Sequence, residues 1–234
     1  FRVEVVDTTT PPTDDPTTPP TDDPTGDWDP AEYPSADDPA PVGQTGDWTF
    51  LFDGGGSRWD PCTTIRWAYN PANAYTGSLD DMKRAFARIA GRTGLHFKYV
   101  GTTDYVHYTG GTFPTGVDIA VGWSDSSVVG QLSGSVVGIG GGSGQSVYDS
   151  DVAYRMSRGY VVLDDQASLR PGYDSTGSPT WGQVMEHETM HSLGLGHAGG
   201  AEEVMYGAVS STNHLFGNGD LTGLTTIGAG SGCL

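Results

Sequence analysis

The chain has little positive charge. Among its 234 residues, 11 are lysine or arginine and 29 are aspartate or glutamate, which gives a net charge of −18. Binding to nucleic acid or to an anionic membrane surface needs a basic surface, so this balance argues against both kinds of partner. No run of 18 apolar residues occurs, and we therefore expect no membrane span. No signal peptide begins at Phe1, so a secreted protein would already have lost its export segment.

Cysteine is also scarce, since the chain has only Cys62 and Cys233. Two cysteines are too few for a disulfide scaffold, but one bridge between them would close a loop of most of the folded region. Such a bridge is worth roughly 4–5 kcal/mol in the chain-entropy model. Two unpaired thiols are the alternative. Because an exposed free thiol near the C-terminus is a liability outside the cell, we predict the bridge.

The first 46 residues differ in composition from the rest. They contain ten of the 15 prolines, eleven acidic residues and one basic residue, and they repeat Pro-Pro-Thr-Asp-Asp-Pro-Thr at 11–17 and 19–25. Such a segment buries too little apolar surface to fold, so we predict a disordered linker over 1–46 and a folded domain over 47–234. The opening FRVEVV is interpreted as a remnant of an upstream propeptide or anchor. Composition favours a plain spacer, and inhibition of a metal site by a linker aspartate is the alternative.

Apolar periodicity in the folded region predicts alternating strands and helices. Ile65, Trp67 and Tyr69 alternate with other residues as in a half-buried strand. Ser78 is the predicted N-cap of a helix that ends at Gly91 to Gly94. We expect an α/β fold in which helices pack on a mostly parallel sheet. Further strands are predicted at 95–100, 117–123 and 159–164, a flexible glycine-rich loop at 138–144, and helices at 181–194 and 220–227.

The segment from His187 to His197, HETMHSLGLGH, is the most informative part of the chain. On a helix, His187 and His191 lie one turn apart on the same face, where both can bind one zinc ion at about 2.0–2.1 Å. Glu188 lies one residue along and is positioned to take a proton from an attacking water. Gly194 can adopt the left-handed conformation that ends helices, which lets His197 return as the third ligand.

Three protein ligands leave one coordination position open, as in catalytic zinc sites. We therefore predict zinc-dependent hydrolysis of peptide bonds with Glu188 as the general base. One alternative is a zinc-binding surface protein without turnover, although an inert site would usually have a fourth protein ligand and would not need Glu188. Others are a zinc hydrolase acting on small amides and a helix whose histidines bind nothing.

The spacing His-Glu-x-x-His-x-x-Gly-x-x-His is similar to that of the metzincin clan of zinc peptidases, and Met205 fits the methionine turn of that clan. The zinc segment and the pair Met205-Tyr206 resemble the matrixins, and the resemblance covers about residues 60–230. It implies a metzincin-like fold with a twisted, mostly parallel five-stranded sheet, two long helices and a short C-terminal helix. It also implies a secreted, extracellular endopeptidase, tethered or free, with an extended peptide or protein as substrate. We expect a monomer.

The chain also departs from the matrixin pattern. Gly207 stands where matrixins usually have proline, and the propeptide latency cysteine is absent. His107 is the only candidate for a second zinc ligand between the strands, so we expect one zinc. For four further aspartates a solvated acidic loop is the favoured interpretation, and calcium binding is the alternative. Its candidate ligands flank the loop where the family often holds calcium: Asp149, Asp151, Asp164 and Asp165.

Overall fold

The computed structural model describes residues 2–5, 40–148, 150–174 and 177–234. Within these ranges the protein is a mixed α/β fold built on one mostly parallel sheet of eight strands. The strands follow the order β4-β3-β5-β7-β6-β1-β8, and β2 pairs with β7 outside this path. The strands are β1 (Arg2–Val5), β2 (Ser57–Arg58), β3 (Ile65–Tyr69), β4 (Phe97–Thr102), β5 (Ile119–Ser124), β6 (Val136–Ser146), β7 (Tyr154–Asp164) and β8 (Ala208–Val209).

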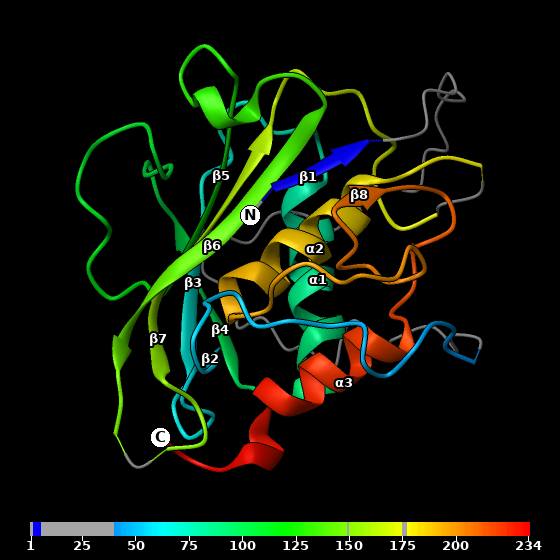
Figure 1. Ribbon diagram of the computed structural model, residues 1–234. Coiled ribbons are helices and arrows are strands. Elements are labelled where there is room, and N and C mark those ends of the chain that lie inside the picture. The colour runs from blue at the N-terminus through cyan, green and yellow to red at the C-terminus, as the bar shows by residue number, and fades with distance from the viewer. Residues whose placement is uncertain (1, 6–39, 149, 175–176) are drawn as a thin grey trace.

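Three α-helices accompany the sheet in the described part of the chain. They are α1 (Ser78–Thr93), α2 (Trp181–Leu193) and α3 (Asn218–Ile227), and two short 3-10 helices span Gly130–Leu132 and Ala229–Ser231. Figure 1 shows α1 and α2 together on one side of the sheet, with α3 beyond them. The α/β class and the mostly parallel sheet predicted from the sequence are confirmed. The predicted five strands become eight because β1, β2 and β8 add two to four residues each.

The packing of β3 against α1 follows from their apolar patterns. Trp67 on β3 stacks on Phe86 of α1 with 4.3 Å between the ring centroids, and both side chains are fully buried. The helix begins one residue earlier than predicted, because Gly77 and not Ser78 is its N-cap. The Ser78 hydroxyl instead accepts a hydrogen bond from the Tyr69 hydroxyl at 2.7 Å. Gly94 ends the helix in the left-handed conformation, at φ 66°.

The glycine-rich stretch is a strand and not the predicted flexible loop. Residues 138–144 lie inside β6, which pairs antiparallel with β7. The glycines are needed because α2 crosses this strand at very short range. A Cβ at residue 140 would lie 2.2 Å from the backbone oxygen of Glu188, and one at residue 138 would lie 2.8 Å from its Oε1 atom. Glycine here therefore brings helix and strand together.

The assignment of residues 1–46 to a linker is wrong at its beginning. Arg2–Val5 forms β1, which pairs antiparallel with β6 and parallel with β8, and the Val3 side chain is fully buried. Figure 1 shows β1 in blue between these two strands and beside α2. The prediction for residues 6–39, including both Pro-Pro-Thr-Asp-Asp-Pro-Thr copies, lies outside the described residues.

The predicted disulfide is confirmed. Cys62 and Cys233 are bonded, with 5.4 Å between their Cα atoms and 171 positions between them in sequence. The Asp60 carboxylate supports the bridge by accepting backbone hydrogen bonds from Cys62 at 3.0 Å and from Leu234 at 3.3 Å. The bridge thus ties the C-terminus to the segment that enters β3. No helix in the described ranges is long and apolar enough to cross a membrane.

Candidate metal centre

Helix α2 carries the histidine motif and lies entirely inside the molecule. Its first turn is capped by Thr180, whose side chain accepts from the Gln183 amide while the Gln183 side chain accepts from the Thr180 amide. All thirteen residues of the helix are buried, including its polar ones. The prediction that Gly194 ends the helix is confirmed, since this residue is the C-cap at φ 111°. A Cβ there would also lie 2.5 Å from the backbone oxygen of Ser57.

The chain turns back after Gly194 and brings three imidazoles together. The candidate ligand nitrogens of His187, His191 and His197 all lie within 4.8 Å of one another. Their ring centroids are separated by 4.6 Å for the first pair, 5.3 Å for His187 and His197, and 4.9 Å for His191 and His197. Three nitrogens that bind one ion at about 2 Å each must lie close together, so this cluster could hold a metal ion.

Backbone carbonyls orient the two helical imidazoles. Nδ1 of His187 lies 2.6 Å from the carbonyl oxygen of Val204, and Nδ1 of His191 lies 2.7 Å from that of Leu195. Because a carbonyl only accepts, each Nδ1 carries the proton and each Nε2 keeps its lone pair. A backbone acceptor on the far nitrogen is the usual support of a histidine that binds metal. Nε2 of His187 is buried and has no hydrogen-bond partner among the described residues.

Burial also keeps these imidazoles neutral. Desolvation lowers the pKa of His187 to about 3 and lowers the pKa of His191 well below its usual range. Only a neutral imidazole can donate its lone pair to a metal, so no proton has to leave either ring at neutral pH. The protonation, the orientation and the convergence of the rings all fit a divalent metal such as zinc, and they need no rearrangement of α2.

Glu188 lies on the turn between the first two histidines and is fully buried. Burial raises the pKa of its carboxyl well above the usual range, and the nearby backbone of Gly140 and Val3 partly opposes this rise. The carboxylate therefore lies where α2 crosses β6. A carboxyl group with a raised pKa, next to three imidazoles, is suited to accepting a proton.

The predicted methionine turn lies next to this cluster. Met205 is buried, and its carbonyl oxygen accepts a hydrogen bond from the Ala198 amide at 2.7 Å. The preceding residue, Val204, supplies the carbonyl that orients His187. Gly207, the departure from the matrixin pattern, lies against His197, the third candidate ligand. A Cβ at residue 207 would lie 3.3 Å from Nδ1 of His197, so glycine leaves this ring its space.

Two buried carboxylates fix the methionine segment to α3. Asp220 accepts hydrogen bonds from the amides of Val204 at 2.6 Å and Met205 at 3.0 Å, and from Gly217 at 3.0 Å. Glu203 accepts from the amides at the start of α3, at 3.1 Å and 2.8 Å. The sequence analysis did not predict this role for Glu203. Its only sequence signal is an acidic residue just ahead of an apolar pair, which is too common to interpret.

The structure does not gather the predicted calcium ligands. Asp151 and Asp164 lie at opposite ends of β7, an 11-residue strand that spans roughly 30 Å. Asp151 pairs with Arg58 at 2.8 Å, and Asp165 accepts a hydrogen bond from Asn73 at 2.9 Å. Asp149 lies outside the described residues. No calcium site follows from this arrangement.

His107 is engaged with aromatic residues. Its ring stacks on Tyr160 with 3.9 Å between centroids, and its Nδ1 atom lies 2.9 Å from the Tyr105 hydroxyl. Within the described ranges, the other candidate metal grouping consists of Asp60 with Cys62 and Cys233. Those two sulfurs are joined to each other and offer no thiolate. The histidine cluster is therefore the candidate metal centre.

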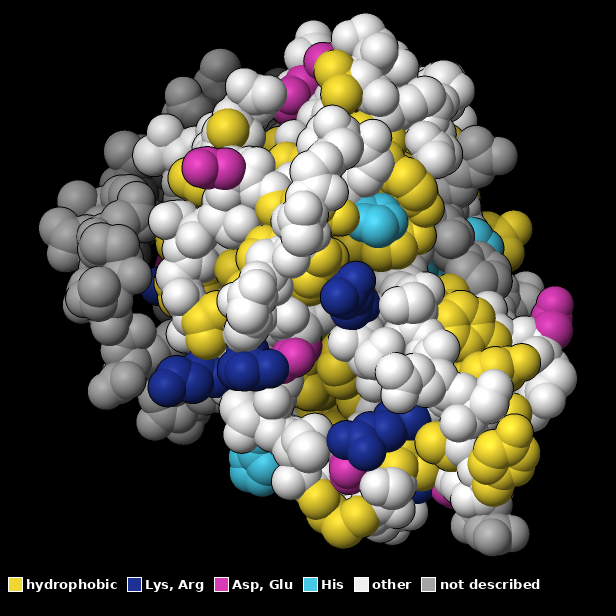
Figure 2. Space-filling view, turned by 90° about the vertical axis from the view of Figure 1, so that its left-hand side faces the viewer, with side chains coloured by type: hydrophobic (Ala, Val, Ile, Leu, Met, Phe, Trp, Pro, Cys, Tyr) yellow, Lys and Arg dark blue, Asp and Glu magenta, His cyan; other side chains and the backbone are white. Residues whose placement is uncertain are grey.

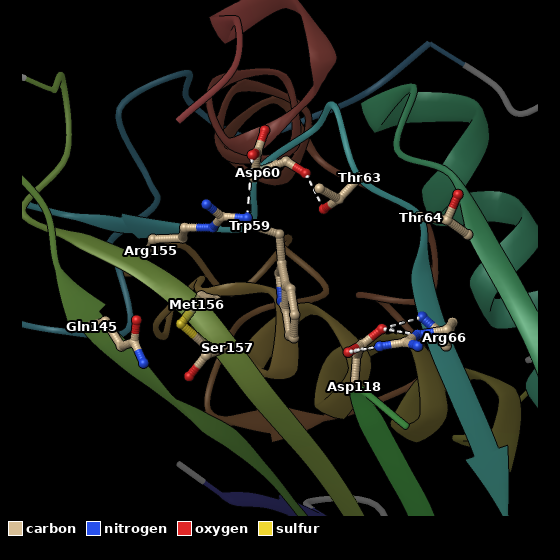
Figure 3. Close-up of a pocket in the computed structure, with 10 residues that line it drawn as sticks. All are labelled: Trp59, Asp60, Thr63, Thr64, Arg66, Asp118, Gln145, Arg155, Met156 and Ser157. Carbon is tan, nitrogen blue, oxygen red and sulfur yellow. Dashed lines mark hydrogen bonds and ion pairs between the residues drawn. The ribbon is translucent and has the colours of Figure 1, made fainter. Parts of the chain in front are cut away.

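A separate pocket of about 340 Å³ opens near the entrance to β3. Figure 3 shows Arg66 and Asp118 facing each other there, with Arg155 beside Asp60 and Trp59. Arg66 donates to Asp118 at 2.9 and 3.0 Å, and Arg155 lies 3.3 Å from Asp60. Figure 2 likewise shows basic side chains beside acidic ones on one face of the molecule. None of the three histidines lines this pocket.

Comparisons with protein-family models and with curated proteins found no match to this chain. Any assignment of function therefore rests on the residues and on the geometry described above.

Proposed function

We propose that this protein is a zinc-dependent endopeptidase of the metzincin type, matrixin-like in its zinc segment. The observation that carries the proposal is the convergence of three imidazoles, two of them buried and neutral, beside the buried Glu188 carboxyl. Zinc, when bound, supplies a Lewis acid that lowers the pKa of water to about 7 and polarises a carbonyl group. The Nε2 atoms of His187, His191 and His197 would bind it.

The residues of the chain have distinct tasks in this proposal. Glu188 accepts the proton of the attacking water and then passes it to the leaving amine, so that no covalent intermediate with the protein is needed. The carbonyl groups of Val204 and Leu195 keep two imidazoles in the required tautomer. Asp220 fixes the backbone of the methionine turn that contains Val204, so its role is one of positioning.

The disulfide supports action outside the cell, because such bonds persist mainly in oxidising compartments. The substrate proposed from the sequence, an extended peptide segment, is consistent with binding as an added strand in this mostly parallel sheet.

The test is digestion of unfolded casein by the full chain, with and without a chelator, beside the variants Glu188→Ala and Glu202→Ala. Glu202 is exposed and serves as the matched control. We expect chelator-sensitive cleavage that falls by roughly 10²–10⁴-fold in Glu188→Ala and is retained in Glu202→Ala. Zinc-loaded protein that cleaves no peptide would show a binding protein instead, and cleavage limited to small amides would show another zinc hydrolase.

A further inference from the structure

Strand β1 lies between two strands that come much later in the sequence, β6 and β8. It runs antiparallel to β6, with Val3 opposite Gly138, and parallel to β8, with Glu4 opposite Ala208. In the strand order of the described residues, β6 and β8 have only β1 between them. Figure 1 shows β1 lying there, alongside α2. The strand therefore fills the space between β6 and β8.

The contacts of β1 reach the reaction centre itself. Strand β1 packs against α2, the helix that carries Glu188, and the Val3 side chain is fully buried in the main apolar cluster. Gly138, the residue opposite Val3, approaches Oε1 of Glu188 so closely that a Cβ would lie 2.8 Å away. An extended peptide presented to the histidine cluster along β6 would need the same backbone positions that β1 now occupies.

The chain allows β1 to leave this position. Residues 6–39 separate β1 from residue 40, and a segment of that length can extend on the order of 110 Å. Removal of β1 exposes one edge of β6, and every other pairing of the sheet apart from that of β8 with β1 stays in place. The remaining strands β3, β4, β5, β6 and β7 form a continuous sheet without it.

We propose that the space between β6 and β8 is the substrate groove and that β1 competes with substrate for it. An extended peptide must then displace Arg2–Val5 before it can be hydrolysed. The inference deepens and rests on the proposed function. It also describes the substrate: the groove accepts a branched aliphatic side chain at the position of Val3, which is buried, and tolerates a polar one at the position of Glu4, which is exposed.

Val3→Asp in the full chain tests the competition, and Glu4→Gln is the matched control in the same strand. An aspartate cannot be buried unpaired at residue 3, so β1 should leave the groove. While β1 is bound, only a fraction of the molecules can bind substrate. Release of β1 should therefore lower KM roughly tenfold or more while kcat stays unchanged. Hydrogen exchange should speed up at residues 136–139 of β6 in Val3→Asp and stay unchanged in Glu4→Gln. Deletion of residues 1–6 should reproduce the result if Val3→Asp fails to fold.

Binding of a fluorescent peptide with the sequence of residues 2–6 separates this inference from the proposed function. Tighter binding to zinc-loaded Val3→Asp than to the native chain supports the competition, even if no form hydrolyses any peptide and the proposed function fails. Hydrolysis with the same KM in the native chain, Val3→Asp and the deletion would overturn the inference and leave the proposed function standing. The inference is also overturned if peptide binding and exchange at β6 are the same in all forms.

Discussion

The histidine cluster at the end of α2 and the Arg66–Asp118 pocket of Figure 3 both contain polar side chains, but their hydrogen bonding differs. In the pocket, Arg66 and Asp118 pair through two hydrogen bonds, and the arginine is about half exposed. In the cluster, Nε2 of His187 is buried and has no hydrogen-bond partner in the described part of the chain. A buried polar atom without a partner indicates a site for a ligand, whereas a set of ion pairs indicates a structural role. Four predictions test this distinction.

The largest stability effect is expected beside the pocket, at the disulfide. Replacing both Cys62 and Cys233 by serine should lower the free energy of unfolding by about 2–5 kcal/mol, because the bridge limits the unfolded chain. Denaturant unfolding measures this change. Below the unfolding transition, kcat should stay unchanged, since the bridge makes no contact with the histidines. A fall in kcat as large as that of Glu188→Ala would show that the disulfide region takes part in catalysis, which would contradict the comparison.

A smaller loss is expected where α2 crosses β6. Gly140→Ala places a Cβ against the backbone oxygen of Glu188, and backbone on both sides leaves little freedom to adjust. Overpacking of this kind costs about 1–3 kcal/mol, and it should also displace Glu188 and lower kcat. Gly130→Ala is the control, because a Cβ there meets nothing within 4 Å. Equal unfolding curves and equal kcat for the two variants would show that the close crossing does not position Glu188.

Replacement of Asp220, whose carboxyl group holds the methionine turn, should change the free energy of unfolding by a similar or smaller amount. Asp220→Asn replaces an acceptor of three backbone hydrogen bonds and should cost about 1–3 kcal/mol near pH 5. Burial raises the pKa of Asp220 in the folded protein, so the stability linked to its proton is present at low pH and is lost as pH rises. The difference between the native chain and the variant should therefore shrink from pH 5 to pH 8. Thermal unfolding across this range checks it, and a difference that grows with pH would contradict the account.

The smallest effect is expected for the pocket pair itself. Arg66→Ala removes a half-exposed ion pair and should change the free energy of unfolding by about 0–1 kcal/mol. Cleavage of casein should be unaffected. A large loss of cleavage without unfolding would show that the pocket of Figure 3 takes part in the activity.

The sequence predicted those elements whose signals are local. The alternation at Ile65–Tyr69 identified β3, and the apolar spacing and glycine ends located α1 and α2 within a few residues. The disulfide followed from the small number of cysteines. The three histidines were predicted to converge because their spacing and Gly194 together determine the geometry of a single helix end.

The errors concern contacts between distant segments. Glycines 138–144 resembled a loop, and only the approach of α2 explains why a strand needs them. Arg2–Val5 is too short and too near a proline-rich segment to predict as a strand, and its partner β6 lies more than 130 residues away. The position of Ser78 depended on a hydrogen bond with Tyr69 that no local pattern indicates. Asp151 and Asp164 were predicted to flank one loop, but they lie near opposite ends of a strand.

Metal analysis of the purified full chain tests the central claim most directly. Zinc is measured by mass spectrometry in the native protein and in His187→Ala after dialysis against trace zinc at neutral pH. We predict one zinc ion per native chain and its loss in His187→Ala, with Glu202→Ala retaining it. A native chain without bound transition metal, or equal zinc in His187→Ala and the native chain, would contradict the account.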